Sequence, residues 1–113
     1  MVTKTRVLHT DEISKIWFGR PSGHRHFRLA IQLADGEILV FPEAPVAALV
    51  RAYIDVKTHP TKRAVELEAR SVPGRKRDYA PTQLLETDRA ENEIQEYLAE
   101  LLTGSEASHN EAI

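Results

Sequence analysis

Residues 26–41 read HFRLAIQLADGEILVF, and the architecture of the chain is built around them. Its first half alternates apolar side chains with others, which is typical of a strand that has one buried face. Asp35-Gly36 then separates this run from a second one, and an Asp-Gly pair favours a two-residue type I′ turn that sets Leu33 opposite Ile38. The stretch therefore predicts a β-hairpin with five side chains on one dry face. These are Leu29, Ile31, Leu33, Ile38 and Val40.

Upstream of the hairpin, residues 11–18 allow two interpretations. Thr10 could cap a short helix that ends at Gly19, whereas the β-branched and aromatic content of the segment favours a strand. The turn-forming residues 20–23 would join such a strand to the hairpin, so we favour the strand. Together the three segments predict an antiparallel meander.

Downstream, Pro42 and Pro45 end the sheet and are compatible with the first turn of a helix. Apolar residues at helical spacing predict that this helix continues to about Lys57. Its apolar stripe consists of Val46, Leu49, Val50, Tyr53 and Ile54.

The last third of the chain predicts two more strands and a second helix. Residues 64–72 alternate with period two, and residues 82–86 are a further strand candidate. Asp88 followed by Glu91 resembles a capping box, and Gly104 is a typical residue for a helix end. The apolar stripe of this helix consists of Ile94, Tyr97, Leu98, Leu101 and Leu102.

These elements predict an α+β fold with the order β-β-β-α-β-β-α. An antiparallel sheet, made of the three-stranded meander with one or two further strands, would carry both helices on one face. Residues 1–104 are expected to form a single domain, and the polar residues 105–113 a disordered tail.

The composition excludes several classes of protein. The chain has 113 residues and no cysteine, which excludes disulfides, thiolate metal sites and a cysteine nucleophile. The first ten residues contain no apolar segment typical of a signal peptide, and no apolar run approaches the roughly 20 residues that span a bilayer. We therefore expect a cytoplasmic protein without membrane association.

Two basic clusters suggest an anion-binding surface. One lies between the first two predicted strands, and the other precedes the fifth and includes an aromatic side chain on which a base could stack. If both loops meet, they could bind phosphate or nucleic acid. The residues concerned are Arg20, His24, Arg25, His26, Arg28, Arg75, Lys76, Arg77 and Tyr79.

Catalytic and metal sites have little support in the sequence. His24 and His26 would point to the same side of an extended chain, but no acidic residue lies near them in sequence to complete a metal site. Glu66 and Glu68 alternate with apolar residues and are expected to face water. No nucleophile elbow, phosphate-binding loop or dinucleotide fingerprint occurs, so we predict neither an enzyme nor a cofactor.

The apolar residues on the other side of the predicted hairpin suggest a surface for a partner. Trp17 or Phe18 would join Leu39 and Phe41 there, and such a patch is a usual place for protein binding. The leading hypothesis is therefore a non-enzymatic interaction module that binds another protein or a second copy of itself. The alternative is a nucleic-acid- or phosphate-binding domain that uses the two basic clusters.

Overall fold

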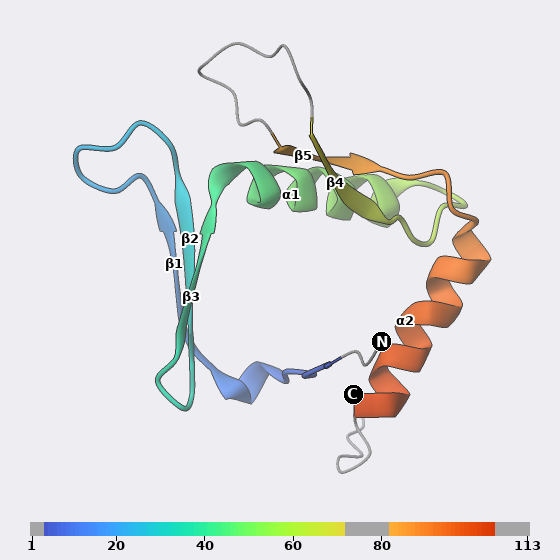
Figure 1. Ribbon diagram of the computed structural model, residues 1–113, viewed down its shortest axis with the longest axis horizontal. Coiled ribbons are helices and arrows are strands. Elements are labelled where there is room, and N and C mark those ends of the chain that lie inside the picture. The colour runs from blue at the N-terminus through green and yellow to red at the C-terminus, as the bar shows by residue number, and fades with distance from the viewer. Residues whose placement is uncertain (1–3, 72–81, 106–113) are drawn as a thin grey trace.

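The computed structural model describes residues 4–71 and 82–105 as two small sheets and two helices (Figure 1). A single turn of 3₁₀-helix, Thr10–Glu12, precedes the first strand. The first sheet contains β1 (Ile13–Gly19), β2 (Arg28–Leu33) and β3 (Ile38–Pro42), in that order and antiparallel. The remaining elements are α1 (Glu43–Thr58), β4 (Leu67–Ser71), β5 (Thr82–Glu86) and α2 (Glu91–Ser105).

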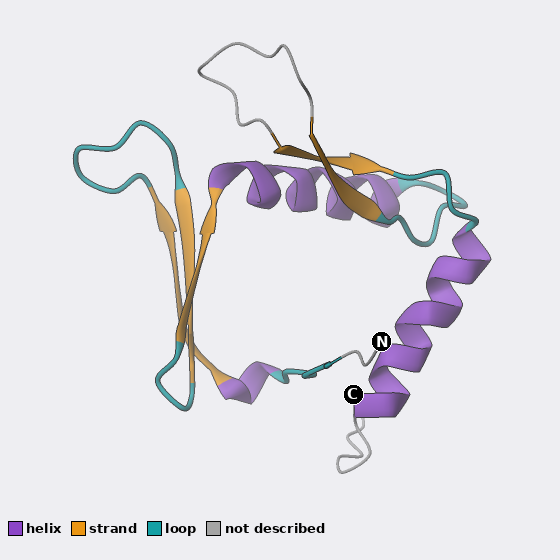
Figure 2. Ribbon diagram, viewed as in Figure 1, coloured by secondary structure: helices purple, strands orange, loops and turns teal. Residues whose placement is uncertain are grey.

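The predicted fold class and element order are confirmed. The segment with two interpretations is a strand from residue 13 onward, because β1 covers Ile13–Gly19 and pairs with β2, with one irregularity between Ile13 and Lys15. Residues 11 and 12 belong to the 3₁₀ turn. The two later strands pair only with each other, so the described strands form two separate sheets (Figure 2).

The turn between β2 and β3 differs from the predicted type I′ turn. Only Gly36 in this turn has a positive φ, 99°, whereas a type I′ turn also requires one at Asp35. The Gly36 N–H donates to the Leu33 carbonyl (2.9 Å), and the Leu33 N–H donates to the Glu37 carbonyl (2.8 Å). This pattern fits a three-residue loop, a type I turn followed by a glycine bulge.

The three-residue loop shifts the register by one residue from that of a two-residue turn. The prediction that Ile38 and Val40 share a buried face with Leu29, Ile31 and Leu33 is therefore wrong. Ile31 lies opposite Leu39, and Gln32 lies opposite Ile38. Because a shift of one residue moves a whole strand's side chains to the other face, Ile38 and Val40 lie on the opposite side from Ile31. Their exposed fractions are 50% and 63%. Leu39 and Phe41 take their place and are half-buried.

Helix α1 follows β3 directly and projects away from the sheet (Figure 1). Its N-terminal part contacts the sheet, and the β4–β5 hairpin lies along the helix. Helix α2 begins near the C-terminal end of α1 (Figure 1). The two helices therefore lie on the same side of the sheet without both packing against it.

The boundaries of α2 differ slightly from those predicted. The helix begins at Glu91 rather than immediately after Asp88, and it includes Gly104. The predicted polar tail lies outside the described residues from 106 onward. No helix in the described ranges combines the length and the apolar character needed to cross a membrane.

The interior of the described structure is small. Among residues 4–71 and 82–103, only Leu33, Ala48 and Ile94 are buried, with exposed fractions of 2%, 6% and 6%. They lie on β2, α1 and α2 respectively, and the β4–β5 hairpin contributes none. Within these ranges, one copy of the chain leaves most of its apolar side chains in contact with water.

Candidate interaction surface

Large apolar side chains are exposed on β1, β3, α1, β5 and α2, and in the connection between β1 and β2. A few scattered ones are normal on a soluble protein, but a contiguous group indicates a binding surface. The exposed set is Ile16, Trp17, Phe18, Phe27, Ile38, Val40, Leu49, Val50, Tyr53, Ile54, Leu85, Tyr97, Leu98 and Leu102.

Helix α1 carries the densest group of these side chains. Residues three and four positions apart share a face of a helix, which places the predicted apolar stripe on one side. Leu49, Val50, Tyr53 and Ile54 are between 49% and 63% exposed, while Val46 is half-buried. These five residues are called the α1 stripe below.

The β4–β5 hairpin covers the opposite side of α1. Ala48 and Ala52 line a shared cavity of about 370 Å³ with Leu67 and Leu84 of the hairpin. Ala48 is buried and Ala52 half-buried, so the alanine side is the more buried side of α1. The larger α1 stripe is left without a partner from the described part of the same chain.

Between α1 and the sheet lies a groove of about 450 Å³. Phe18 and Phe27 stack there with ring centroids 5.4 Å apart and planes 15° from parallel. Val46 and Val50 of the α1 stripe form the other wall, so the groove continues into the exposed stripe. The remaining lining residues are Glu43, Ala47 and Arg51. This feature is called the α1 groove.

The structure separates the residues of the predicted partner patch. Phe18, Leu39 and Phe41 share one face of the sheet, and Phe18 reaches the α1 groove. Trp17 lies on the other face, where it is aligned with Ala30 and Val40. Phe27 and the exposed α1 stripe were missing from the predicted patch, although the helical spacing had identified the stripe itself.

The first basic cluster lies in the connection between β1 and β2. Its side chains are exposed except for Arg28, which is half-exposed. A carboxylate that is distant in sequence lies beside it: Glu43 accepts a hydrogen bond from the Phe27 N–H (2.9 Å) and lies 3.5 Å from His26 Nδ1. The predicted residues of this cluster are Arg20, His24, Arg25, His26 and Arg28.

The second basic cluster, Arg75, Lys76, Arg77 and Tyr79, lies outside the described residues. Within the described ranges no three His, Asp or Glu side chains gather in a way that could hold a metal ion, and His24 and His26 are no exception.

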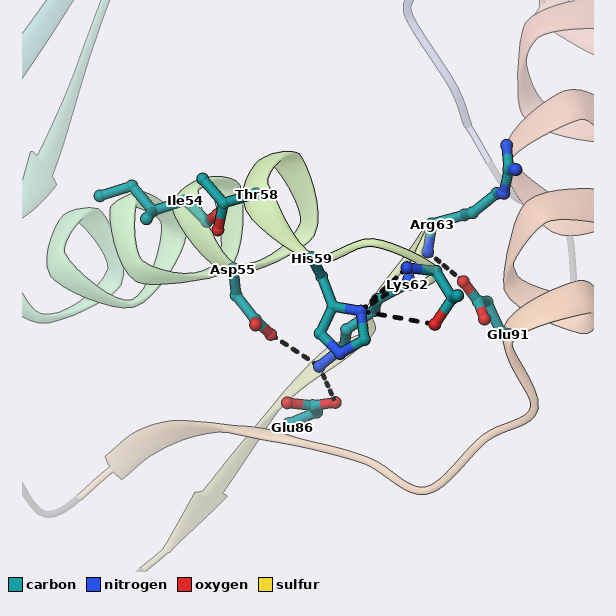
Figure 3. A network of polar contacts seen from close by, with 9 residues as sticks. Ile54, Asp55, Thr58, His59, Lys62, Arg63, Glu86 and Glu91 are labelled. Atoms are coloured by element: carbon teal, nitrogen blue, oxygen red, sulfur yellow. Dashed lines mark hydrogen bonds and ion pairs between the residues drawn. The ribbon is translucent and has the colours of Figure 1, made fainter.

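A network of ion pairs joins the end of α1 to β5 (Figure 3). Lys62 Nζ donates to Asp55 (2.7 Å) and to Glu86 (3.0 Å), and His59 Nδ1 accepts the backbone N–H of Lys62 (3.0 Å). The hydrogen bond from Lys62 lowers the pKa of Asp55. The hydrogen bonds to Asp55 and Glu86 in turn raise the pKa of Lys62.

The same region fixes the start of α2. Glu66 accepts hydrogen bonds from the Thr87 hydroxyl (2.9 Å) and from Arg89 (3.0 Å). The backbone N–H of Arg63 donates to Glu91, the first residue of α2 (Figure 3). Together with the ion pairs of Lys62, these contacts are called the polar clamp. The sequence placed Glu66 and Glu68 facing water, but Glu66 belongs to the clamp, whereas Glu68 pairs with nearby Arg70.

Replacing Glu66 by glutamine should reduce the sensitivity of the fold to acid. Hydrogen bonds from Thr87 and Arg89 lower the pKa of Glu66, so the folded state favours its charged form. This stabilisation is complete above the pKa of an unfolded glutamate, about 4.3, and is lost as the pH falls through the lowered pKa. We expect the melting temperature of Glu66→Gln to fall less than that of the wild type on acidification.

The matched control is Glu68→Gln on the neighbouring strand position. Glu68 is 58% exposed and pairs only with Arg70 in the described contacts. Equal acid dependence of the Glu66→Gln variant and the wild type would show that the charge of Glu66 does not contribute to stability.

Comparison with known protein families, with curated proteins and with solved structures finds no match to this chain. The fold and the exposed surface together define a small α+β protein with an uncovered helix face. Its function is therefore inferred from the chemistry of that face.

Proposed function

We propose that this chain is a non-enzymatic interaction module that works as an assembly of its own copies. The observation that carries the proposal is the exposed α1 stripe. Tyr53 and Leu49 on this stripe are 63% and 60% exposed on a well-formed helix. Burying such side chains gives roughly 25 cal/mol for each Å² of apolar surface removed from water, so a partner for this face would be strongly favoured.

The composition of the surface is that of an interface centre. Such centres are enriched in aromatic side chains and depleted in charged ones. The α1 stripe and the α1 groove contribute Phe18, Phe27 and Tyr53, with Arg51 and Glu43 at the side. A tyrosine surrounded by aliphatic side chains is a usual centre of binding energy.

The charge distribution favours a second copy as the partner. Residues 1–85 carry 14 Lys and Arg against 9 Asp and Glu, while residues 86–113 carry 1 against 8. Two copies can therefore place the acidic end of one beside the basic part of the other. Complementary charges of this kind raise the association rate and select the partner.

Sedimentation equilibrium of the purified chain tests the proposal. Over a range of about 1 to about 100 µM, which covers micromolar dissociation constants, we expect the average mass to rise above 12.8 kDa toward at least twice that value. A mass that stays at 12.8 kDa throughout this range would contradict the proposed function.

A further inference from the structure

We propose that α2 of one copy lies in the α1 groove of a second copy, and that the two copies exchange these helices. The inference rests on the proposed function and adds which segments meet. Reciprocal exchange gives a closed dimer, because each copy supplies one helix and one groove.

The polar clamp explains why a chain does not fill its own groove. The groove lies at the N-terminal part of α1, with Val46 and Val50, whereas the clamp holds the start of α2 near the other end. Arg89 pairs with Glu66 (3.0 Å) and lies 5.4 Å from the ring centroid of Tyr97, which fixes the direction of the first turns of α2. In Figure 1, α2 accordingly runs downward from the far end of α1 and lies across the view from the first sheet.

The free face of α2 has the form of a groove-binding helix. Ile94 is buried within its own chain, whereas Tyr97, Leu98 and Leu102 are 42%, 51% and 53% exposed. Side chains at this spacing make one apolar side of a helix, which is how amphipathic helices bind in apolar grooves. Ile94 lies at the start of this same apolar side, so the first turn of the stripe is anchored in its own chain while the following residues are exposed.

The charges of the two surfaces are complementary. Helix α2 carries four glutamates and no lysine or arginine. The lining of the α1 groove carries one charge of each sign, Arg51 and Glu43, and its Phe27 wall belongs to the basic connection between β1 and β2, residues 20–27. The positive charge of this connection beside the groove attracts an acidic helix and would repel a basic one. The glutamates are Glu91, Glu93, Glu96 and Glu100.

Engineered cysteines can test the exchange, because the native chain contains no cysteine. Val50→Cys places a thiol in the groove, and Leu98→Cys places one on the free side of α2. The two single variants are mixed, incubated so that copies can exchange, oxidised and analysed as intact disulfide-linked chains by mass spectrometry. The substitutions give the two chains different masses, so a mixed disulfide is identified directly.

We expect the mixed disulfide to form at least about tenfold more than with a control, because a disulfide requires Cα atoms within roughly 7 Å. The control partner is Ala99→Cys, which is exposed on α2 away from the apolar side. Equal yields with Ala99→Cys, or no mixed product, would overturn the exchange.

Two further results separate the failure of this inference from the failure of the proposed function. A wild-type dimer in sedimentation combined with no Val50–Leu98 link overturns the exchange and leaves self-association intact. A chain carrying both substitutions that forms a disulfide within single copies shows that α2 enters its own groove, which also overturns the exchange. A wild-type monomer contradicts the proposed function itself.

Discussion

Replacing Tyr53 by glutamate should weaken the assembly by roughly 100-fold or more in dissociation constant, since truncating a central interface tyrosine often costs 2 kcal/mol or more and a buried unpaired carboxylate adds to that cost. Tyr53 is 63% exposed in the single copy, so its loss removes little from the fold of that copy. Sedimentation equilibrium measures the dissociation constant, and thermal unfolding monitored by circular dichroism checks that the variant is folded.

Ala44→Glu is the matched control for this substitution. Ala44 is exposed on the same helix, nine positions earlier and therefore about half a turn around the axis from Tyr53. It adds the same charge outside the α1 stripe, and we expect the dissociation constant to stay within a few-fold of the wild type. Similar values for Tyr53→Glu, Ala44→Glu and the wild type would exclude the α1 stripe from the interface.

Replacing Leu33 by alanine should destabilise the fold by about 2–5 kcal/mol, the usual range for deleting a buried leucine side chain. Leu33 is the largest fully buried side chain among the described residues, and few other buried groups could compensate for the cavity. The free energy of unfolding can be measured in urea. Assembly stabilises the folded chain by mass action, so all variants must be compared at one protein concentration.

Val40→Ala on the adjacent strand gives the contrast. Val40 is 63% exposed on the other face of the same sheet, so its truncation leaves no cavity. We expect a loss below about 1 kcal/mol, in the range of surface substitutions. Equal losses for Leu33→Ala and Val40→Ala would mean that the interior of the sheet does not centre on Leu33.

The order of the elements could be predicted from the sequence because it depends on local patterns. Alternation before Asp35-Gly36 indicated β2, and Pro42 followed by helical spacing indicated α1 almost to its observed end at Thr58. Each of these signals involves residues within a few positions of one another. Such patterns are read directly from sequence.

The register of the hairpin depends on the backbone conformation of Asp35. Both the type I′ turn and the three-residue loop accept Asp-Gly, and they differ in whether Asp35 also adopts a positive φ. The structure gives positive φ to Gly36 alone, which is the cheaper arrangement for L-residues. The negative φ of Asp35 therefore sets the register that places Ile38 and Val40 on the surface instead of in the expected interior.

The interaction surface could be predicted only in part. Spacing shows which residues of α1 share a face, but an amphipathic pattern does not say whether the covering partner belongs to the same chain. The β4–β5 hairpin instead lies on the side of α1 that carries Ala48 and Ala52. In the sequence these small residues did not indicate a covered face. The polar clamp was also missed, since Lys62 and Glu86 lie 24 positions apart.

The three buried side chains of the described ranges have a consequence for how long the protein persists in a cell. A lone copy would open often, and opened chains are continuously removed by proteases. Associated copies would be degraded more slowly, so the steady-state amount of the protein should rise more steeply than its rate of synthesis. Turnover, as well as binding, would then depend on how many copies are present.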